Sequence, residues 1–229
     1  MSQPNPPDAE LIISYLTLRK ALGYIGIAMP IVVRLGAKYF EQIPSTESIS
    51  AYYYTGMRDV FVGTLFAVGV FLFFYRGPDT QDNVVTNVAG LAAVAIGLLP
   101  TEPVYHPIIL ERFPRLFSAE CYNNHGPLGF HIYAVATFFV LISYLVTFRF
   151  TRPSQPIVTK QKKSRNIVYV VTGVVMLLSL VLIIVIKAVS KSGSIFWPET
   201  IAIVAFGIAW LTKGQTFLKD KPAIAPPVR

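Results

Sequence analysis

The stretch from Ile167 to Ile186 contains no charged residue, and it constrains the fold more than any other feature of the chain. A helix needs about 20 apolar residues to cross the hydrocarbon core of a bilayer. Five further apolar stretches lie at residues 21–35, 60–75, 84–99, 127–148 and 196–211. The sequence therefore predicts an all-α polytopic membrane protein whose fold is a bundle of six transmembrane helices.

The composition fits a single membrane-embedded domain. Charged residues make up 14% of the chain, whereas a soluble domain carries about 25%. We expect a disordered tail at residues 1–10, the transmembrane domain at 11–218 and a C-terminal tail at 219–229. The segment 11–18, followed by Arg19 and Lys20, is expected to form a separate interfacial turn. Residues 1–10 do not resemble a cleaved signal peptide, so the first span is expected to target the protein.

The net charge of +8 is distributed as in a membrane protein. The largest basic group follows the fourth apolar stretch, where a cytoplasmic loop sets the topology and meets lipid headgroups. With the N-terminus inside, the inner segments hold 13 basic residues and the outer segments 7. We predict a bacterial inner-membrane protein with both termini in the cytoplasm, in contact with lipids and not with nucleic acid. The basic group comprises Arg149, Arg152, Lys160, Lys162, Lys163 and Arg165.

Aromatic and small residues give two further expectations. Tyr and Trp side chains near the span ends are typical of interfacial belts. Small residues let membrane helices approach closely, so the stretches 60–75 and 84–99 are expected to pack tightly, through Gly63 and Ala67 on one side and Gly90, Ala93 and Gly97 on the other. The expected belt residues are Tyr39, Tyr52, Tyr53, Tyr54, Tyr75, Trp197 and Trp210.

Polar side chains at the outer level of the predicted bundle form the candidate site. Polar groups in a membrane are costly, and each is a candidate for function. His131 would lie about 9 Å below the start of its span, where it needs a hydrogen-bond partner. We predict an outward-opening polar pocket in which His131 meets Asp59 or Glu199. The rim would suit an anionic headgroup. The predicted pocket residues are Asp59, Arg58, His131, Glu199, Tyr53 and His125.

Two other interpretations of these residues remain open. Zinc could be bound by some of His106, His125 and His131 with a carboxylate, although residues 125 and 131 do not share one helical face. We favour no metal or other cofactor, and zinc is kept only as an alternative. In the second interpretation the acidic groups only complement helix dipoles, since Asp59 and Glu199 each begin a predicted span.

Two segments carry a resemblance to known proteins: SISAYYYTGMRDVFVG near the second stretch and FWPETIAIVAFGIAWLTKG at the sixth. With KKSRNIVYVVTGVVM between them, the chain resembles a group of small bacterial membrane proteins that is distantly similar to the Frag/DRAM/Sfk-like six-span proteins. The resemblance implies a six-helix bundle and a lipid-related accessory role, and it carries over no catalytic residue.

A comparison with alkaline-ceramidase-like membrane hydrolases is less favourable. Those enzymes use a Ser, an Asp and three His around zinc, and the chain has Ser48 or Ser50, Asp59 and three histidines. That family also expects a His-x-x-x-His pair on a late helix, and the sixth stretch here has no histidine.

The sequence thus favours a non-catalytic accessory protein, or one that binds a lipid or small ligand; the candidate partners are membrane lipids and another membrane protein. It contains no P-loop, dinucleotide fingerprint or HExxH motif. Two alternatives stay open: a metal-dependent intramembrane hydrolase acting on a lipid, and a small transporter, for which repeated halves would be expected.

Overall fold

The computed structural model describes residues 6–43, 45–99, 101, 129–153, 159–190 and 193–218. This part of the chain is helical and contains no strand. Its long helices are α1 (Pro6–Glu41), α2 (Arg58–Phe74), α3 (Thr80–Leu98), α6 (Gly129–Tyr144), α7 (Lys160–Val189) and α8 (Phe196–Lys213). A 3₁₀-helix, η1 (Ser50–Tyr54), precedes α2, and a π-helical turn, η2 (Leu145–Arg149), extends α6. A helix therefore forms at each of the six apolar stretches.

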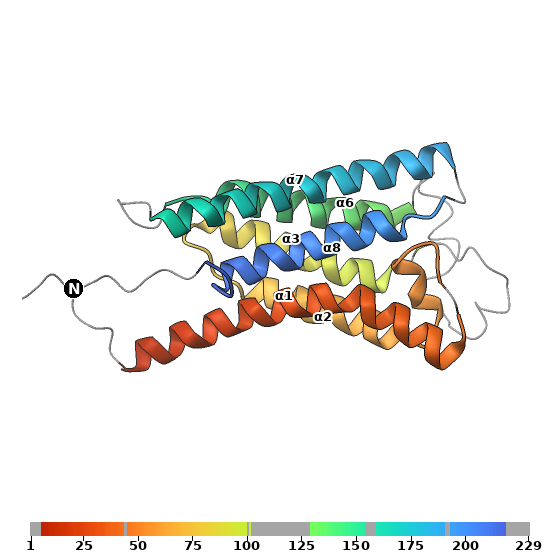
Figure 1. Ribbon diagram of the computed structural model, residues 1–229, viewed down its shortest axis with the longest axis horizontal. Coiled ribbons are helices and arrows are strands. Elements are labelled where there is room, and N and C mark those ends of the chain that lie inside the picture. Colours follow the sequence, from red (N-terminus) through yellow and green to blue (C-terminus); the bar gives the residue numbers. More distant parts are fainter. Residues whose placement is uncertain are drawn as a thin grey trace, which may run out of the picture.

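The six helices run side by side and alternate in direction (Figure 1). Each packs on the next one in the chain, and α8 returns to pack on α1, so that the bundle closes into a ring. One end of the bundle carries η1 and the connection from α7 to α8. The other end carries the start of α3, η2 and the end of α8 (Figure 1). We refer to these as the η1 end and the Arg149 end.

Three helical segments are long and apolar enough to cross a membrane: Tyr15–Glu41, Gly129–Arg149 and Lys160–Val189. They carry many exposed apolar side chains, including Leu178 and Val181 on α7. A helix with such an outward surface requires an apolar surrounding. The part of the chain that the structure describes therefore has the character of a membrane-associated helical protein.

The N-terminal segment differs from the prediction. Helix α1 begins at Pro6 and continues to Glu41 as one helix that includes Pro30. The segment 11–18 is part of this helix and not a separate interfacial turn. Arg19 explains the difference, because its guanidinium lies 5.5 Å from the ring centroid of Tyr75 at the end of α2. The basic pair that suggested a headgroup boundary thus contributes a side chain to helix packing.

Two pairs of glycines allow backbones to approach closely. A Cβ atom on Gly69 would lie 2.9 Å from the carbonyl oxygen of Gly90, and one on Gly90 would lie 2.8 Å from that of Gly69. The same reciprocal contact joins Gly23 of α1 to Gly207 of α8. The expected tight packing of α2 on α3 is present, but it passes through Gly69, because a Cβ atom on Gly63 would meet no atom of another helix within 4 Å.

Substituting alanine at these two glycines of α2 should give different results. Gly69→Ala is expected to cost about 1–3 kcal/mol of unfolding free energy, since the new methyl group meets backbone that cannot rotate away. Gly63→Ala, on the same helix, should leave stability unchanged or slightly raise it. Chemical unfolding of both variants in the same detergent measures the difference. Equal stabilities would contradict the close approach of α2 and α3.

The expected aromatic belt holds for only part of its residues. Tyr39 and Trp197 are largely exposed, as a belt requires. The others are buried, because their side chains face the interior of the bundle: the rings of Tyr75 and Trp210, for example, pack edge to face at 5.3 Å. Position near a span end therefore does not decide whether an aromatic side chain faces lipid. The buried members are Tyr52, Tyr53, Tyr54, Tyr75 and Trp210.

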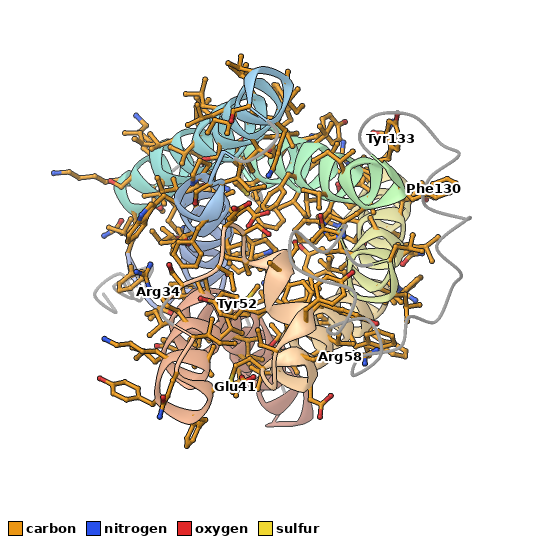
Figure 2. All side chains as sticks on the ribbon, turned by 90° about the vertical axis from the view of Figure 1, so that its right-hand side faces the viewer. Arg34, Glu41, Tyr52, Arg58, Phe130 and Tyr133 are labelled. Carbon is orange, nitrogen blue, oxygen red and sulfur yellow. The ribbon has the colours of Figure 1, made fainter. Side chains whose placement is uncertain are left out.

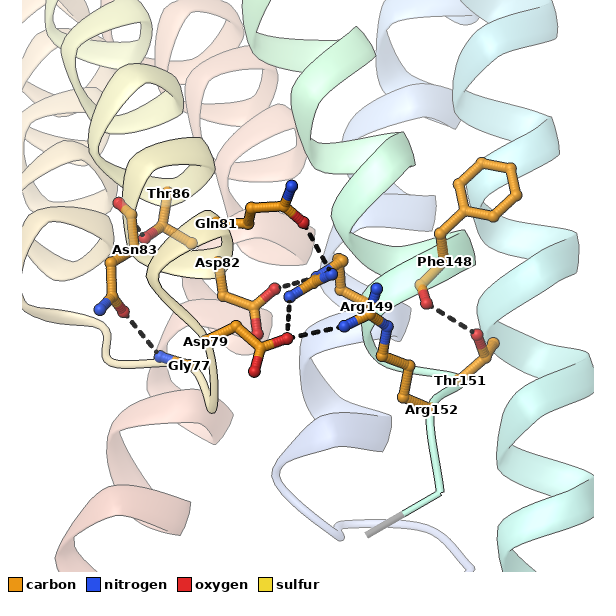
Figure 3. Close-up of polar contacts among 10 residues, drawn as sticks. All are labelled: Gly77, Asp79, Gln81, Asp82, Asn83, Thr86, Phe148, Arg149, Thr151 and Arg152. Atoms are coloured by element: carbon orange, nitrogen blue, oxygen red, sulfur yellow. Dashed lines mark hydrogen bonds and ion pairs between the residues drawn. The ribbon is translucent and has the colours of Figure 1, made fainter.

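An ion-pair network closes the Arg149 end (Figure 3). The Arg149 side chain is 1% exposed and pairs with Asp82, which is 5% exposed, and with Asp79. Its Nη1 also donates to Gln81 at 3.1 Å, while Arg152 reaches Asp79 at 2.6 Å from the surface. The wide π-helical turn of η2 ends at Arg149 and carries it toward α3. Arg149, expected to contact lipid headgroups, instead fastens α6 to α3.

Candidate functional site

The 3₁₀-helix η1 folds back over one end of the bundle and closes it. Tyr52 is fully buried and Tyr53 is 2% exposed. Figure 2 looks along the bundle from this end, with Tyr52 in the middle, Arg58 at the rim and Tyr133 on the outer edge. The segment before η1 is tied to the start of α8, because the backbone N–H of Ile195 donates to the carbonyl of Glu47 at 2.8 Å. The segment 45–54 therefore covers this end of the bundle, and we call it the lid.

His131 of α6 is buried and makes two hydrogen bonds. Its Nδ1 lies 2.7 Å from the carbonyl oxygen of Leu99, and its Nε2 lies 2.9 Å from the hydroxyl oxygen of Ser50. A carbonyl oxygen only accepts, so Nδ1 carries the proton. In the neutral ring Nε2 is then an acceptor, and the Ser50 hydroxyl donates to it. His131 thus joins α6, η1 and the residue after α3.

Glu199 of α8 is also buried, at 8% exposure. Its carboxylate accepts a hydrogen bond from the backbone N–H of Ile49 and interacts with the backbone of Ser50. The carboxylate therefore caps the start of η1 from a distant helix. Its role goes beyond complementing the dipole of α8, because it holds the lid in place.

An apolar cavity of about 60 Å³ lies inside the bundle beneath η1. Side chains from α1, α2, α3, α6 and α8 contribute to its wall, among them Met29, Phe61, Ile96 and Phe138. Ser50, Thr64 and Glu199 are its polar side chains. A water molecule needs roughly 10–15 Å³ of this kind of space, so the cavity has room for a few groups of that size. Ser50 belongs to η1, Glu199 to the first turn of α8 and Thr64 to α2.

Of the predicted pocket residues that the structure describes, Glu199 is in the cavity wall, and His131 contacts it only through Ser50. Arg58 donates to the hydroxyl of Tyr53, and its guanidinium lies 4.3 Å from the centroid of that ring. Neither residue is part of the cavity wall, and Asp59 is exposed on the surface of α2. His106 and His125 lie outside the described residues. His131 and Glu199 both contact the segment that contains Ile49 and Ser50. Asp59 lies away from this segment.

Ser50 is the residue that the sequence did not select as a partner of His131. The two are 81 positions apart, and no local motif such as a nucleophile elbow surrounds Ser50. Only the fold of residues 45–54 over the bundle brings them together.

The described part of the chain contains no cluster of metal-ligating side chains that would support the zinc alternative. Among those residues, no group of three His, Cys, Asp or Glu side chains is placed to hold a metal ion. Two of the three candidate histidines fall outside that part, so the zinc site stays a sequence-based alternative.

Comparisons with known proteins identify no relative. No protein-family model matches the chain, and neither a curated protein nor a solved structure matches it.

Proposed function

We propose that this protein is an integral membrane protein with six spans that binds a small, mainly apolar ligand in the cavity beneath η1. One observation carries the proposal: the cavity is mainly apolar but has Ser50, Thr64 and Glu199 in its wall. Such a combination of apolar lining with a few placed polar groups is typical of small-molecule sites. The cavity has room for only a few non-hydrogen groups, so it would hold the hydroxyl or ester end of an acyl-chain ligand, and the rest of the chain would extend from it between the helices.

The six-span topology is supported by the alternation of the helices. α2 has only 17 residues, close to the lower limit for a membrane span, but it packs between α1 and α3. The Arg149 end holds the basic residues of η2 and of the start of α7, so it would face the cytoplasm. Both termini would then lie in the cytoplasm, and η1 would face the opposite side.

Cysteine accessibility tests this topology. With Cys121 replaced by Ser, a cysteine at Ser164 should react with a membrane-impermeant maleimide only after the cells are opened. A cysteine at Tyr39, near the η1 end, should react in intact cells. The reverse pattern would contradict the assigned orientation, and equal labelling of the two in intact cells would contradict the topology.

Filling the cavity should prevent ligand binding. Val135 lies in the cavity wall, whereas Val140, on the same helix, faces outward with 47% exposure. Val135→Phe is expected to weaken binding of monocaprylin, a short-chain monoacylglycerol, at least ~10-fold, which corresponds to about 1.4 kcal/mol. Val140→Phe is the matched control and should bind as the native protein does. Equilibrium dialysis in amphipol measures both. Unchanged binding by Val135→Phe would contradict the proposal.

A second candidate function, hydrolysis of an acyl ester, is favoured by the Ser50–His131 hydrogen bond. A nucleophile within 2.9 Å of a base, with the base oriented by a third group, is the arrangement used for covalent catalysis. Here the Leu99 carbonyl orients the ring. Ser50 is also part of the cavity wall, so an ester bound there would lie beside the hydroxyl group.

The residues balance the reaction in two steps. The oxygen of Ser50 would attack the ester carbonyl while Nε2 of His131 takes the hydroxyl proton. The bond to the alcohol would break as His131 returns that proton to the leaving oxygen. In the second step, water would attack the acyl carbonyl while the same nitrogen takes a proton from it. The bond to the Ser50 oxygen would break, and His131 would return the proton to that oxygen, which releases the acid and regenerates Ser50.

A fluorophosphonate probe separates binding from hydrolysis. If Ser50 is a nucleophile, the probe should label it, and labelling should fall at least ~100-fold in His131→Gln. Ser48→Ala is the control, since the Ser48 hydroxyl instead accepts from the backbone N–H of Ala51 at 3.1 Å. If Ser50 is not labelled in a protein that still binds monocaprylin, hydrolysis by Ser50 is excluded and ligand binding remains as the proposed function.

A further inference from the structure

Four cationic side chains gather at the Arg149 end, far from the cavity beneath η1. They are Arg19 of α1, Lys162 and Arg165 of α7, and Lys213, the last residue of α8. Lys213 interacts electrostatically with each of the other three. We call these four residues the cation cluster.

The cation cluster surrounds a group of packed aromatic rings. The Nζ atom of Lys213 lies 4.3 Å from the ring centroid of Phe150, and Lys162 lies 5.8 Å from that of Tyr169. The Phe150 ring in turn packs on Tyr169 and on Trp210, with centroids 5.5 Å and 5.4 Å apart. Lys213 and Lys162 are each attracted by a ring face, but this attraction does not cancel the electrostatic repulsion between the two ammonium groups.

The described carboxylates near the cation cluster already form ion pairs with other residues. Asp82 is the carboxylate near Lys213, and it pairs with Arg149, while Asp79 pairs with Arg149 and Arg152. In the described residues, no salt bridge involves Arg19 or Lys213, and Nε of Arg19 is buried without a hydrogen-bond partner. Lys162 and Arg165 donate to the carbonyls of Phe150 and Leu218, whereas Arg19 and Lys213 place two positive charges in a partly buried region without a described carboxylate as a salt-bridge partner.

We propose that the cation cluster binds the phosphate group of an anionic molecule at the membrane surface. Arginine and lysine together are suited to phosphate, since the guanidinium supplies directed donors and the ammonium a compact charge. The site lies where α7 begins and α8 ends, which is the level of the headgroups if the helices span the bilayer. Phosphate is the chemistry shared by a phospholipid headgroup and a soluble phosphate, and the test separates the two.

The test measures the Tm of the delipidated full chain in detergent. Phosphatidylglycerol should raise the Tm of the native protein by about 5 °C, whereas phosphatidylcholine should not, and added salt should reduce the rise. Lys213→Gln should lose the rise. Without any anion its Tm should equal or exceed that of the native protein, because one repelling charge is gone. Arg19→Gln is a second variant with the same expectation.

Lys163→Gln is the matched control, since Lys163 is exposed in the first turn of α7. It should respond to phosphatidylglycerol as the native protein does. A rise with inorganic phosphate that Lys213→Gln abolishes would support the site and assign it to a soluble ligand. An equal rise in Lys213→Gln and the native protein, or no rise with either anion, would overturn the proposal. Neither result bears on the binding of monocaprylin, because the cavity lies toward the other end of the bundle.

Discussion

Replacing Arg149 with leucine is expected to lower the Tm of the detergent-solubilised protein by roughly 6–20 °C. The substitution leaves the buried carboxylate of Asp82 without its partner, and an unpaired buried charge is among the most destabilising changes in a protein. The contact between α3 and the end of α6 should loosen first. Thermal unfolding followed by tryptophan fluorescence measures the effect, because Trp210 lies in the aromatic group that includes Phe150.

Arg152→Leu is the matched control for this prediction. Arg152 pairs with the same Asp79, but its side chain is 55% exposed, and exposed ion pairs contribute little. Its Tm should therefore change by about 2 °C or less. The double variant Arg149→Leu/Asp82→Leu should recover part of the loss, since it removes both buried charges. Equal Tm values for Arg149→Leu and Arg152→Leu would show that the network does not fasten the helices.

His131→Ala is expected to cost about 2–5 kcal/mol of unfolding free energy. The substitution leaves the Ser50 hydroxyl and the Leu99 carbonyl without a partner in a buried place, at about 1–3 kcal/mol each, and opens a cavity. Because His131 connects α6 to η1, we also expect the lid to become accessible. Hydrogen exchange of the backbone amides of residues 48–54 should therefore increase.

Tyr133→Ala is the control for the His131 prediction. Tyr133 lies on the same helix, two residues further, and its side chain is 52% exposed on the outer edge. Its removal should change the unfolding free energy by less than about 1 kcal/mol and leave amide exchange in η1 unchanged. If His131→Ala left the exchange of η1 unchanged, the hydrogen bond to Ser50 would not hold the lid.

The helices could be predicted from the sequence because each carries its own signal. An apolar stretch of sufficient length favours a helix wherever the backbone must satisfy its own hydrogen bonds. All six stretches are helical in the described residues; the ends of α2, α3 and α8 are close to those expected, while α1 and α7 are longer than expected. The continuity of α1 from Pro6 was missed, because the basic pair Arg19 and Lys20 suggested a headgroup boundary at that point.

The site could be predicted only in part. His131 was singled out because a histidine within an apolar helix must find a partner, and the structure gives it two. Which partners it finds depends on the fold: Ser50 belongs to a lid that carries no helix signal, and Glu199 reaches a backbone N–H some 150 positions away in the chain. Asp59, selected for its place at the start of a span, faces outward.

The sequence by itself determined that the chain forms apolar helices suited to a membrane, where they lie, and that a few polar side chains stand within them. These properties depend on hydrophobicity and on the local hydrogen bonding of the helix. Only the tertiary structure decided that Gly69 and not Gly63 meets α3, that Arg149 is paired inside the bundle, and that Ser50, His131 and Glu199 converge beneath η1. Those choices depend on which helix faces meet, and the energy of such a contact belongs to two distant segments at once.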